Sequence, residues 1–217
     1  MRGKPLTLLG PELKAGEKAP DFEAVTDSLQ DVNLEKTGHA VRIFSVIPSL
    51  DTPVCDAQTK RFNEEAAKLD GIEIYTISMD LPFAQKRWCG AFGVDKVKML
   101  SDHRTGSFGE HYGTMIKELR IESRAIFVLD KDGTIKHVEY VKEVADHPNY
   151  EAALASARPV NLPFVRFVAQ LAWRHRRGNT NRTAYRQDPS HFPHSRGADV
   201  ARYGEKVCPA EDCAARA

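Results

Sequence analysis

Among the side chains able to carry out nucleophilic or redox chemistry, Cys55 has the most informative surroundings. The apolar, β-branched run at residues 41–47 ends in Pro48 and is typical of a buried strand entering a turn. Thr52 and Pro53 then supply a predicted capping hydroxyl and the residue best suited to a first helical position. Cys55 is therefore predicted in the first turn of a helix, where free backbone N–H groups and the helix dipole favour the reactive thiolate.

The spacing Pro-x-x-x-Thr-x-x-Cys, formed by Pro48, Thr52 and Cys55, resembles the active-site pattern of the peroxiredoxins. The longer strings at residues 48–56 and 80–90 resemble those of the thiol peroxidase subfamily, the atypical two-cysteine peroxiredoxins that close their disulfide within one chain. Further agreement extends this resemblance over residues 1–157 and is found at residues 3–10, 18–22 and 148–154. The resemblance implies a thioredoxin-like fold and a thiol-dependent peroxidase acting on hydrogen peroxide and organic hydroperoxides.

Peroxide reduction needs in-line attack of a thiolate on the O–O bond and stabilisation of the charge on the departing oxygen. We expect Cys55 to be the nucleophile. The hydroxyl of Thr52, three residues earlier, can accept from the thiol and donate toward a bound peroxide, although it could also serve only as a helix cap. Pro48 is expected to shape the pocket and to shield the oxidised sulfur.

Arg124 stands directly before the apolar strand predicted at residues 125–129. Alone, it could be a surface ion-pair partner, which contributes little. The resemblance instead places it beside the nucleophilic sulfur and the peroxide, where a guanidinium favours the thiolate and the transition state. Arg42 and Arg120 are expected to be ordinary surface arginines.

Cys89 is identified through the resemblance as the resolving cysteine, with a buried spectator thiol as the alternative. Its attack on the Cys55 sulfenic acid would form a Cys55–Cys89 disulfide and release water, stopping oxidation at a reversible stage. A disulfide needs Cα atoms within about 7 Å, so we expect the first turn at Cys55 and the helix bearing Cys89 to unwind partly. The resemblance implies thioredoxin as the external reductant.

The order of predicted elements indicates an α/β protein, a mixed sheet with helices on both faces. Strands are expected at 41–47, 72–79, 97–100, 125–129 and 134–141, and helices at 53–70, 82 onward, 107–112 and 148–157. Asp80 is expected to cap the second of these helices, with Pro82 in its first turn. Cys55 then falls beyond the carboxyl end of a strand, where sites form in such sheets.

Charge divides the chain near Ala157. Residues 1–157 carry 20 basic and 25 acidic residues, whereas residues 158–217 carry 11 basic residues, ten of them arginine, and 5 acidic ones. We predict a peroxiredoxin domain at 1–157 and a basic, largely disordered extension at 158–217, with a possible amphipathic helix at 162–177. An altered reading frame after Ala157 would also explain the switch in composition.

The extension leaves alternatives open. Zinc could be bound by four side chains, but their spacing is weak evidence for such a site: His191, His194, Cys208 and Cys213. Nucleic-acid binding by the arginines is supported equally weakly. Membrane contact by this segment is not expected. The basic tail could instead deliver a peroxide signal to a partner, which would make the protein a redox-sensing adaptor.

Composition narrows the function further. No Cys-x-x-Cys occurs, which disfavours a general disulfide oxidoreductase. No phosphate-binding loop, flavin pattern or metal-ligand spacing lies near Cys55, so neither a cofactor nor a metal is expected. No secretory signal or apolar run of membrane-spanning length is present, and a cytoplasmic location is expected. The family resemblance implies a homodimer.

Overall fold

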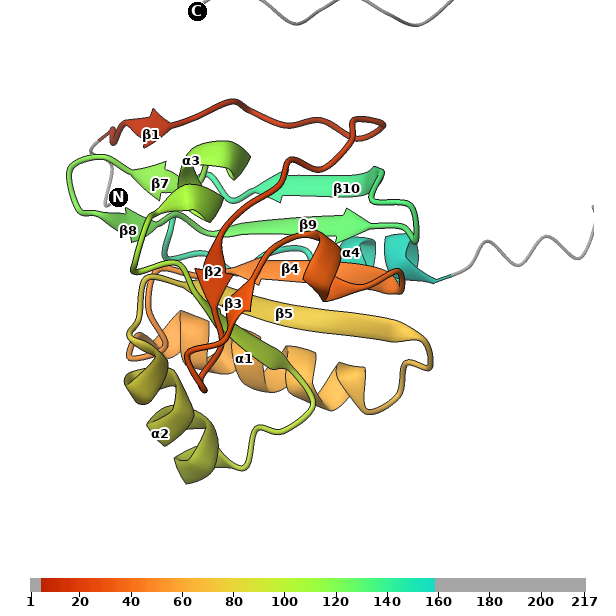
Figure 1. The fold of residues 1–217 in the computed structure, drawn as a ribbon, viewed down its shortest axis with the longest axis horizontal. Helices are drawn as coiled ribbons and strands as arrows, with labels where there is room; N and C mark the ends of the chain where they lie inside the picture. The colour runs from red at the N-terminus through yellow and green to blue at the C-terminus, as the bar shows by residue number, and fades with distance from the viewer. Residues whose placement is uncertain (1–4, 159–217) are drawn as a thin grey trace, which may run out of the picture. The chain divides into compact units, whose positions relative to one another are not determined.

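A seven-stranded mixed sheet forms the centre of the computed structural model, which describes residues 5–158 (Figure 1). Its strand order is β10-β9-β4-β5-β6-β2-β3, in which β4, β5 and β6 are parallel and β9 and β10 are antiparallel to their neighbours. The strands are β2 (Ala24–Val25), β3 (Asp31–Val32), β4 (Val41–Val46), β5 (Ile72–Ser78), β6 (Lys98–Ser101), β9 (Ala125–Leu129) and β10 (Ile135–Tyr140). The predicted fold class is confirmed.

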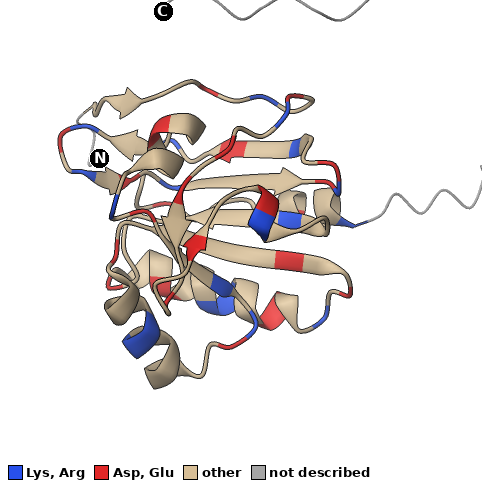
Figure 2. Cartoon of the chain, in the orientation of Figure 1, with Lys and Arg blue, Asp and Glu red and all other residues tan. Residues whose placement is uncertain are grey.

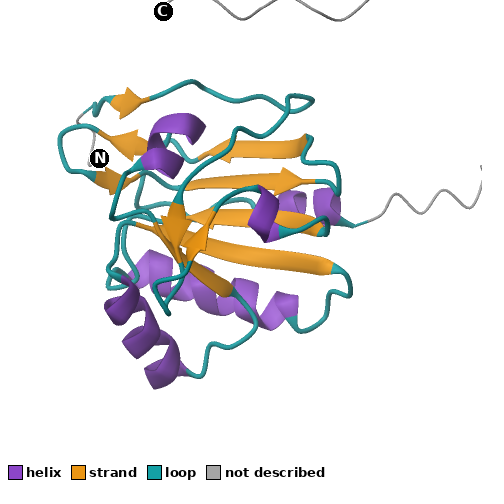
Figure 3. Ribbon diagram, in the orientation of Figure 1, coloured by secondary structure: helices purple, strands orange, loops and turns teal. Residues whose placement is uncertain are grey.

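Helices cover both faces of this sheet (Figure 3). Alternate residues of each strand point to opposite faces, so Ile43 and Phe44 of β4 belong to two separate apolar cores. The core around Ile43 is covered by α1 (Pro53–Ala66), α2 (Pro82–Phe92) and α4 (Tyr150–Ala157). The core around Phe44 is covered by α3 (Ser107–Tyr112) and the N-terminal segment, with Phe108 and Tyr112 stacked 4.1 Å apart.

A second, three-stranded sheet was not predicted. It consists of β1 (Leu8–Leu9), β7 (Met115–Ile116) and β8 (Ile121–Glu122), in the order β1-β7-β8. Strands of two residues carry no detectable period, which explains why sequence patterning misses them. The β7–β8 hairpin matters for the site because it delivers the chain to Arg124, directly before β9.

Element boundaries differ from the predictions in two informative places. The Cys55 helix α1 ends at Ala66 instead of near residue 70, and a turn leads on to β5. The expectation that Asp80 caps α2 is wrong, because the N-cap residue is Leu81 and no side chain caps the helix. Residues 159–217, which include nearly all of the predicted extension and its helix at 162–177, lie outside the described residues.

Arg42 is buried, contrary to the expectation of a surface position, with 2% of its surface exposed. It lies in β4 on the same face as Phe44, and its guanidinium donates to Thr37 Oγ1, the Gly38 carbonyl and the Asp130 carbonyl. These acceptors replace the water that a surface arginine would bind. Arg120 is exposed, as expected.

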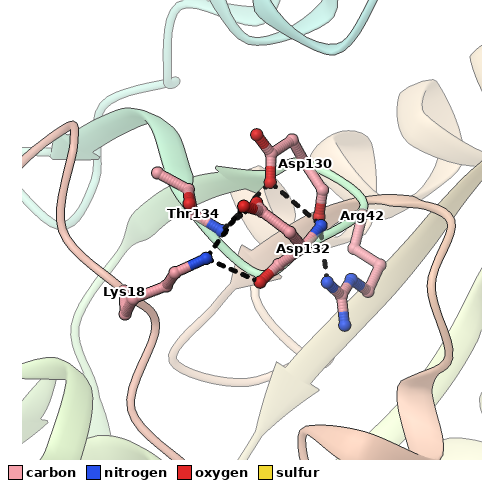
Figure 4. A network of polar contacts seen from close by, with 5 residues as sticks. All are labelled: Lys18, Arg42, Asp130, Asp132 and Thr134. Carbon is pink, nitrogen blue, oxygen red and sulfur yellow. Dashed lines mark hydrogen bonds and ion pairs between the residues drawn. The ribbon is translucent and has the colours of Figure 1, made fainter. Parts of the chain in front are cut away.

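The Asp130 carbonyl belongs to a polar network at the β9–β10 turn, shown in Figure 4. Asp130 Oδ1 accepts from the backbone N–H groups of Asp132 and Thr134, and Lys18 Nζ lies 2.9 Å from Asp132 Oδ2. This network connects the N-terminal segment, the hairpin turn and Arg42 at the end of the sheet that holds the start of β4. The active-site residues lie at the opposite end of β4.

Charged residues of both signs are spread over the described elements (Figure 2). α2 differs from α1 in carrying basic but no acidic residues, namely Lys86 and Arg87, both of which are exposed. No helix within residues 5–158 is long and apolar enough to cross a membrane.

Candidate active site

Cys55 lies in the first turn of α1 and is fully buried. β4 ends at Val46, and a short loop carries the chain to Thr52, the N-cap residue, and to Pro53, the first helical residue. This confirms the predicted strand–turn–helix placement of the cysteine. The thiol therefore lies near the N-terminal end of the helix, where the backbone dipoles favour negative charge.

The expected capping hydroxyl of Thr52 is not found. Thr52 has the extended backbone of an N-cap residue, but its side chain accepts no hydrogen bond from the helix. The hydroxyl instead donates to the carbonyl of Ser49 at 3.1 Å, and the residue is exposed. With its hydrogen on a backbone carbonyl, the oxygen has lone pairs available on the solvent side of the first turn.

Arg124 makes direct contact with the sulfur of Cys55. Its Nη2 donates to Cys55 Sγ at 3.2 Å, and only 1% of the arginine is exposed. The strand register brings these residues together, because β4 and β9 are antiparallel and pair Val46 with Ala125. The residue before β9 therefore lies beside the segment that follows β4.

Two further groups hold the guanidinium in place. Its Nε donates to the Val144 carbonyl at 3.0 Å, and its Nη1 donates to Gln58 Oε1 at 2.5 Å. Gln58 is itself fixed by Ser45, since its Nε2 donates to Ser45 Oγ at 2.8 Å, and both residues are fully buried. Together these contacts aim one guanidinium nitrogen at the sulfur.

Sequence reasoning missed Gln58 and Ser45. A usable signal existed for the first, because Gln58 follows Cys55 by three residues and residues at this spacing share one face of a helix. Ser45 carries no such signal, since a serine in an apolar strand most often satisfies its hydroxyl locally. Only the pairing of α1 with β4 in three dimensions reveals its partner.

Tyr150 of α4 forms a wall of the same apolar cluster as Cys55. Its ring packs 5.5 Å from that of Phe62, and its hydroxyl lies 2.8 Å from His147 Nδ1. Burial raises the pKa of Tyr150 above its usual value, so the phenol stays neutral near the sulfur at physiological pH.

Pro48 is buried at the start of the loop between β4 and α1. The structure therefore places the predicted site residues Pro48, Thr52 and Cys55 in one loop and first turn, and brings Arg124 to them from β9. A surface groove of about 370 Å³ adjoins this turn, with Pro53 and Trp88 among its lining residues, so it lies between α1 and α2.

Cys89, the fifth predicted site residue, lies on α2 and is half-buried against the apolar cluster that contains Cys55. Both thiols are free in this structure. Burial raises the pKa of the Cys89 thiol, and the negative charge of Asp27 raises it further. The two cysteines thus differ in environment, since only Cys55 has a cation on its sulfur.

No group of three or more His, Cys, Asp or Glu side chains within residues 5–158 is arranged to hold a metal ion. The proposed zinc ligands of the extension, His191, His194, Cys208 and Cys213, lie outside the described residues. The arrangement provides one buried sulfur in contact with a guanidinium and a second sulfur on the adjacent helix.

Comparison with known proteins shows the family to which the chain is similar. The redoxin family model matches residues 14–154. A thiol peroxidase of Bacillus subtilis is 57% identical over 157 residues, which cover 72% of this chain and 94% of that protein. A thiol peroxidase of Clostridium acetobutylicum is 50% identical over 157 residues, which cover 72% of this chain and 95% of that one.

Solved structures give the same result for the fold. The crystal structure of a peroxiredoxin-like protein from Aquifex aeolicus matches with a TM-score of 0.67 and 41% identity, covering 72% of this chain and 92% of that one. A thiol peroxidase from Chromobacterium violaceum matches with a TM-score of 0.64, covering 80% of this chain and 95% of that one. At 20% identity, the second match supports the fold alone.

Proposed function

The chain belongs to the redoxin family and is a thiol peroxidase of the peroxiredoxin type, and we propose that it reduces hydrogen peroxide and organic hydroperoxides through Cys55, resolved by Cys89 and recycled by thioredoxin. The observation that carries this proposal is the 3.2 Å contact between Arg124 Nη2 and Cys55 Sγ at a helix N-terminus. Helix dipole and guanidinium act together in a buried site, where electrostatic effects are strong.

In the first step, the Cys55 thiolate attacks one oxygen of the peroxide. The S–O bond forms as the O–O bond breaks, and the departing oxygen takes a proton and leaves as water or an alcohol. The product is a sulfenic acid at Cys55. Arg124 stabilises the thiolate before attack and the developing negative charge during it.

Thr52 and Pro48 have supporting roles in this step. The Thr52 hydroxyl, exposed at the first turn, can orient a peroxide oxygen when it turns from the Ser49 carbonyl. The buried Pro48 ring shapes the pocket next to the loop and shields the sulfenic acid from excess water and peroxide.

In the second step, the sulfur of Cys89 attacks the sulfur of the sulfenic acid, and water leaves as the disulfide forms. Cys55 is fully buried and Cys89 lies on a separate helix, so the first turn of α1 and part of α2 must open. A dithiol protein then reduces the Cys55–Cys89 bond by donating two electrons and two protons, and is itself oxidised to a disulfide. α2 offers such a protein apolar surface, with Phe83 and Phe92 exposed by 65% and 52%.

Peptide mass spectrometry of the fully reduced chain, after one equivalent of peroxide, tests this cycle. We expect one intrachain bond between Cys55 and Cys89, and a stable Cys55 sulfenic acid in the Cys89→Ser variant. Capture of Cys55 by Cys208 or Cys213 instead would show that Cys89 does not resolve the sulfenic acid. Equal amide-exchange protection of α1 and α2 in reduced and oxidised protein would contradict the proposed opening.

The adaptor alternative rests on the residues that have no counterpart in the curated relatives, which match about 157 residues of this chain. An enzyme consumes many peroxides per chain when thioredoxin and its reductase are present, whereas a sensor turns over few and needs its tail. A chain ending at Arg158 should therefore keep its turnover within about twofold if the tail plays no part in catalysis. We also propose a homodimer, on the family resemblance, and a cytoplasmic location, as expected from the sequence.

A further inference from the structure

Asp80 holds the loop at residues 48–52 against the end of β5. Its Oδ1 accepts a hydrogen bond from Ser49 Oγ at 2.7 Å, and its Oδ2 accepts one from the backbone N–H of Leu50 at 2.8 Å. Hydrogen bonds to a carboxylate are about twice as strong as those between neutral groups. One side chain therefore fixes the start of the loop that leads to Cys55.

The same carboxylate is connected to α2 through Ser78. Ser78 Oγ donates to Asp80 Oδ2 at 2.9 Å and accepts from Nε2 of Gln85, a buried residue of α2, at 3.1 Å. The Gln85 amide also donates to the Leu100 carbonyl of β6 at 3.0 Å. The loop that leads to Cys55 and the helix that carries Cys89 thus share one anchor at the ends of β5 and β6.

We propose that Asp80 is a positioning residue that controls how readily this loop and α2 open for disulfide formation. The inference rests on the proposed function, because it takes Cys89 as the resolving cysteine. Formation of the Cys55–Cys89 bond requires the first turn of α1 to leave its buried position. Movement of the loop breaks both hydrogen bonds from residues 49 and 50 to Asp80.

The strength of this anchor determines whether the oxidised enzyme forms the disulfide or a sulfinic acid. With the loop closed, the Cys55 sulfenic acid can react with a second peroxide, which gives a sulfinic acid and one water or alcohol. With the loop open, the Cys89 sulfur attacks and water leaves. If opening is a rapid pre-equilibrium, the rate of disulfide formation is proportional to the open population, so a weaker anchor favours the disulfide.

The Asp80→Asn variant tests this inference, since it keeps the side-chain shape but loses the negative charge and one acceptor. We expect disulfide formation in a single turnover to be about tenfold faster, and the peroxide dose that converts half of Cys55 to sulfinic acid to be about tenfold higher. The rate constant for the first peroxide reaction should stay within about twofold, because the closed form still predominates. Rapid-quench mass spectrometry measures all three quantities.

Two further variants keep the test sharp if Asp80→Asn folds poorly. Ser49→Ala removes only the 2.7 Å hydrogen bond to Asp80. It should raise the ratio of disulfide to sulfinic acid formed, as Asp80→Asn does, but by a smaller factor. Asp70→Asn, which removes an exposed charge just before β5, should leave the ratio unchanged. In the reduced protein, Asp80→Asn should increase the amide-exchange rates of residues 48–55 and of α2 together.

An unchanged or slower disulfide step in both Asp80→Asn and Ser49→Ala would overturn the inference. So would a loss of the first peroxide reaction in proportion to a general loss of stability. Failure of the proposed function is seen separately, because the wild-type chain would then form no Cys55–Cys89 bond at all.

Discussion

At the scale of single residues, the central feature is that one of the three groups accepting hydrogen bonds from the Arg124 guanidinium can carry a negative charge. Its three hydrogen-bond acceptors are the Val144 carbonyl, the Gln58 amide oxygen and the Cys55 sulfur. Two of these are neutral under all conditions. The Cys55 sulfur is therefore the one of these three acceptors that can serve as a counter-ion to the buried guanidinium.

Gln58→Glu should weaken this arrangement. The new carboxylate would pair with Arg124 and compete with the Cys55 sulfur for the guanidinium. We expect the rate constant for peroxide to fall at least about tenfold, with a parallel fall in alkylation of Cys55 by iodoacetamide. Ser45→Ala loosens the same glutamine without adding charge and should cost less than about threefold. A Gln58→Glu enzyme with wild-type alkylation and peroxide rates would contradict this account of Arg124.

The pH dependence of the second step should report on Cys89. Its pKa is raised by burial and by Asp27, so near neutral pH the nucleophilic thiolate is the minor form. Below that pKa, the rate of disulfide formation should rise about tenfold per pH unit. Asp27→Asn lowers the pKa and should speed the step at fixed pH, whereas Asp95→Asn, which removes an exposed charge, should not. Rapid-quench mass spectrometry between pH 6.5 and about 8.5 checks both, and a flat profile would exclude a rate-limiting thiolate attack.

At the scale of elements, the first turn of α1 shows that a threonine can occupy the N-cap position without capping the helix through its side chain. Thr52 occupies the N-cap position, yet its hydroxyl gives no hydrogen bond to the helix. Thr52→Ala should therefore lower the peroxide rate about a hundredfold while the unfolding midpoint moves by less than about 2 °C. Thr52→Ser should restore most of the rate. A clear drop in thermal stability with normal peroxide kinetics would assign the threonine a structural role instead.

The sequence predicts those elements in which apolar residues recur with a clear helical or strand period. The bounds expected for α3 and β9 match the structure, and β4, β5 and β10 differ from theirs by a residue or so at an end. Asp80 shows where such reasoning stops. Its position before Pro82 is typical of a cap, but the carboxylate binds the loop at Ser49 and Leu50, thirty residues earlier. A sequence pattern indicates hydrogen-bond partners only among neighbouring residues, so it does not reveal the contact between Asp80 and the distant loop.

The same limit applies to the site. Pro48, Thr52 and Cys55 are recognised because their spacing resembles the peroxiredoxin pattern, and they are close in sequence, on one loop and the first turn of α1. The contact of Arg124 with the sulfur follows from the antiparallel register of β4 and β9, which the sequence does not specify. Resemblance to a family pointed to the arginine, but its buried support by Gln58 became evident only in the structure.

At the scale of the whole molecule, the buried carboxyl group of Glu122 packs the small sheet against α3. It is fully buried on β8, it accepts a hydrogen bond from Thr114 Oγ1 at 2.6 Å, and its oxygens occupy the space that a side chain at Gly109 would need. Burial raises the pKa of Glu122 well above its usual value, and the nearby charge of Asp102 raises it further. Glu122 therefore keeps its proton to a higher pH in the folded protein than in the unfolded chain.

This difference fixes the sign of a pH effect on stability. Because the folded-state pKa is the higher one, the stabilising contribution of Glu122 is complete below its unfolded pKa and is lost as pH rises toward the folded value. Glu122→Gln is neutral throughout, so its free energy of unfolding relative to wild type should rise by about 1.4 kcal/mol per pH unit in that window. Urea unfolding of the full chain between pH 5 and about 8 measures this difference. The exposed Glu64→Gln should give a flat difference, and a flat line for Glu122→Gln as well would show that the buried carboxyl is ionised in the fold.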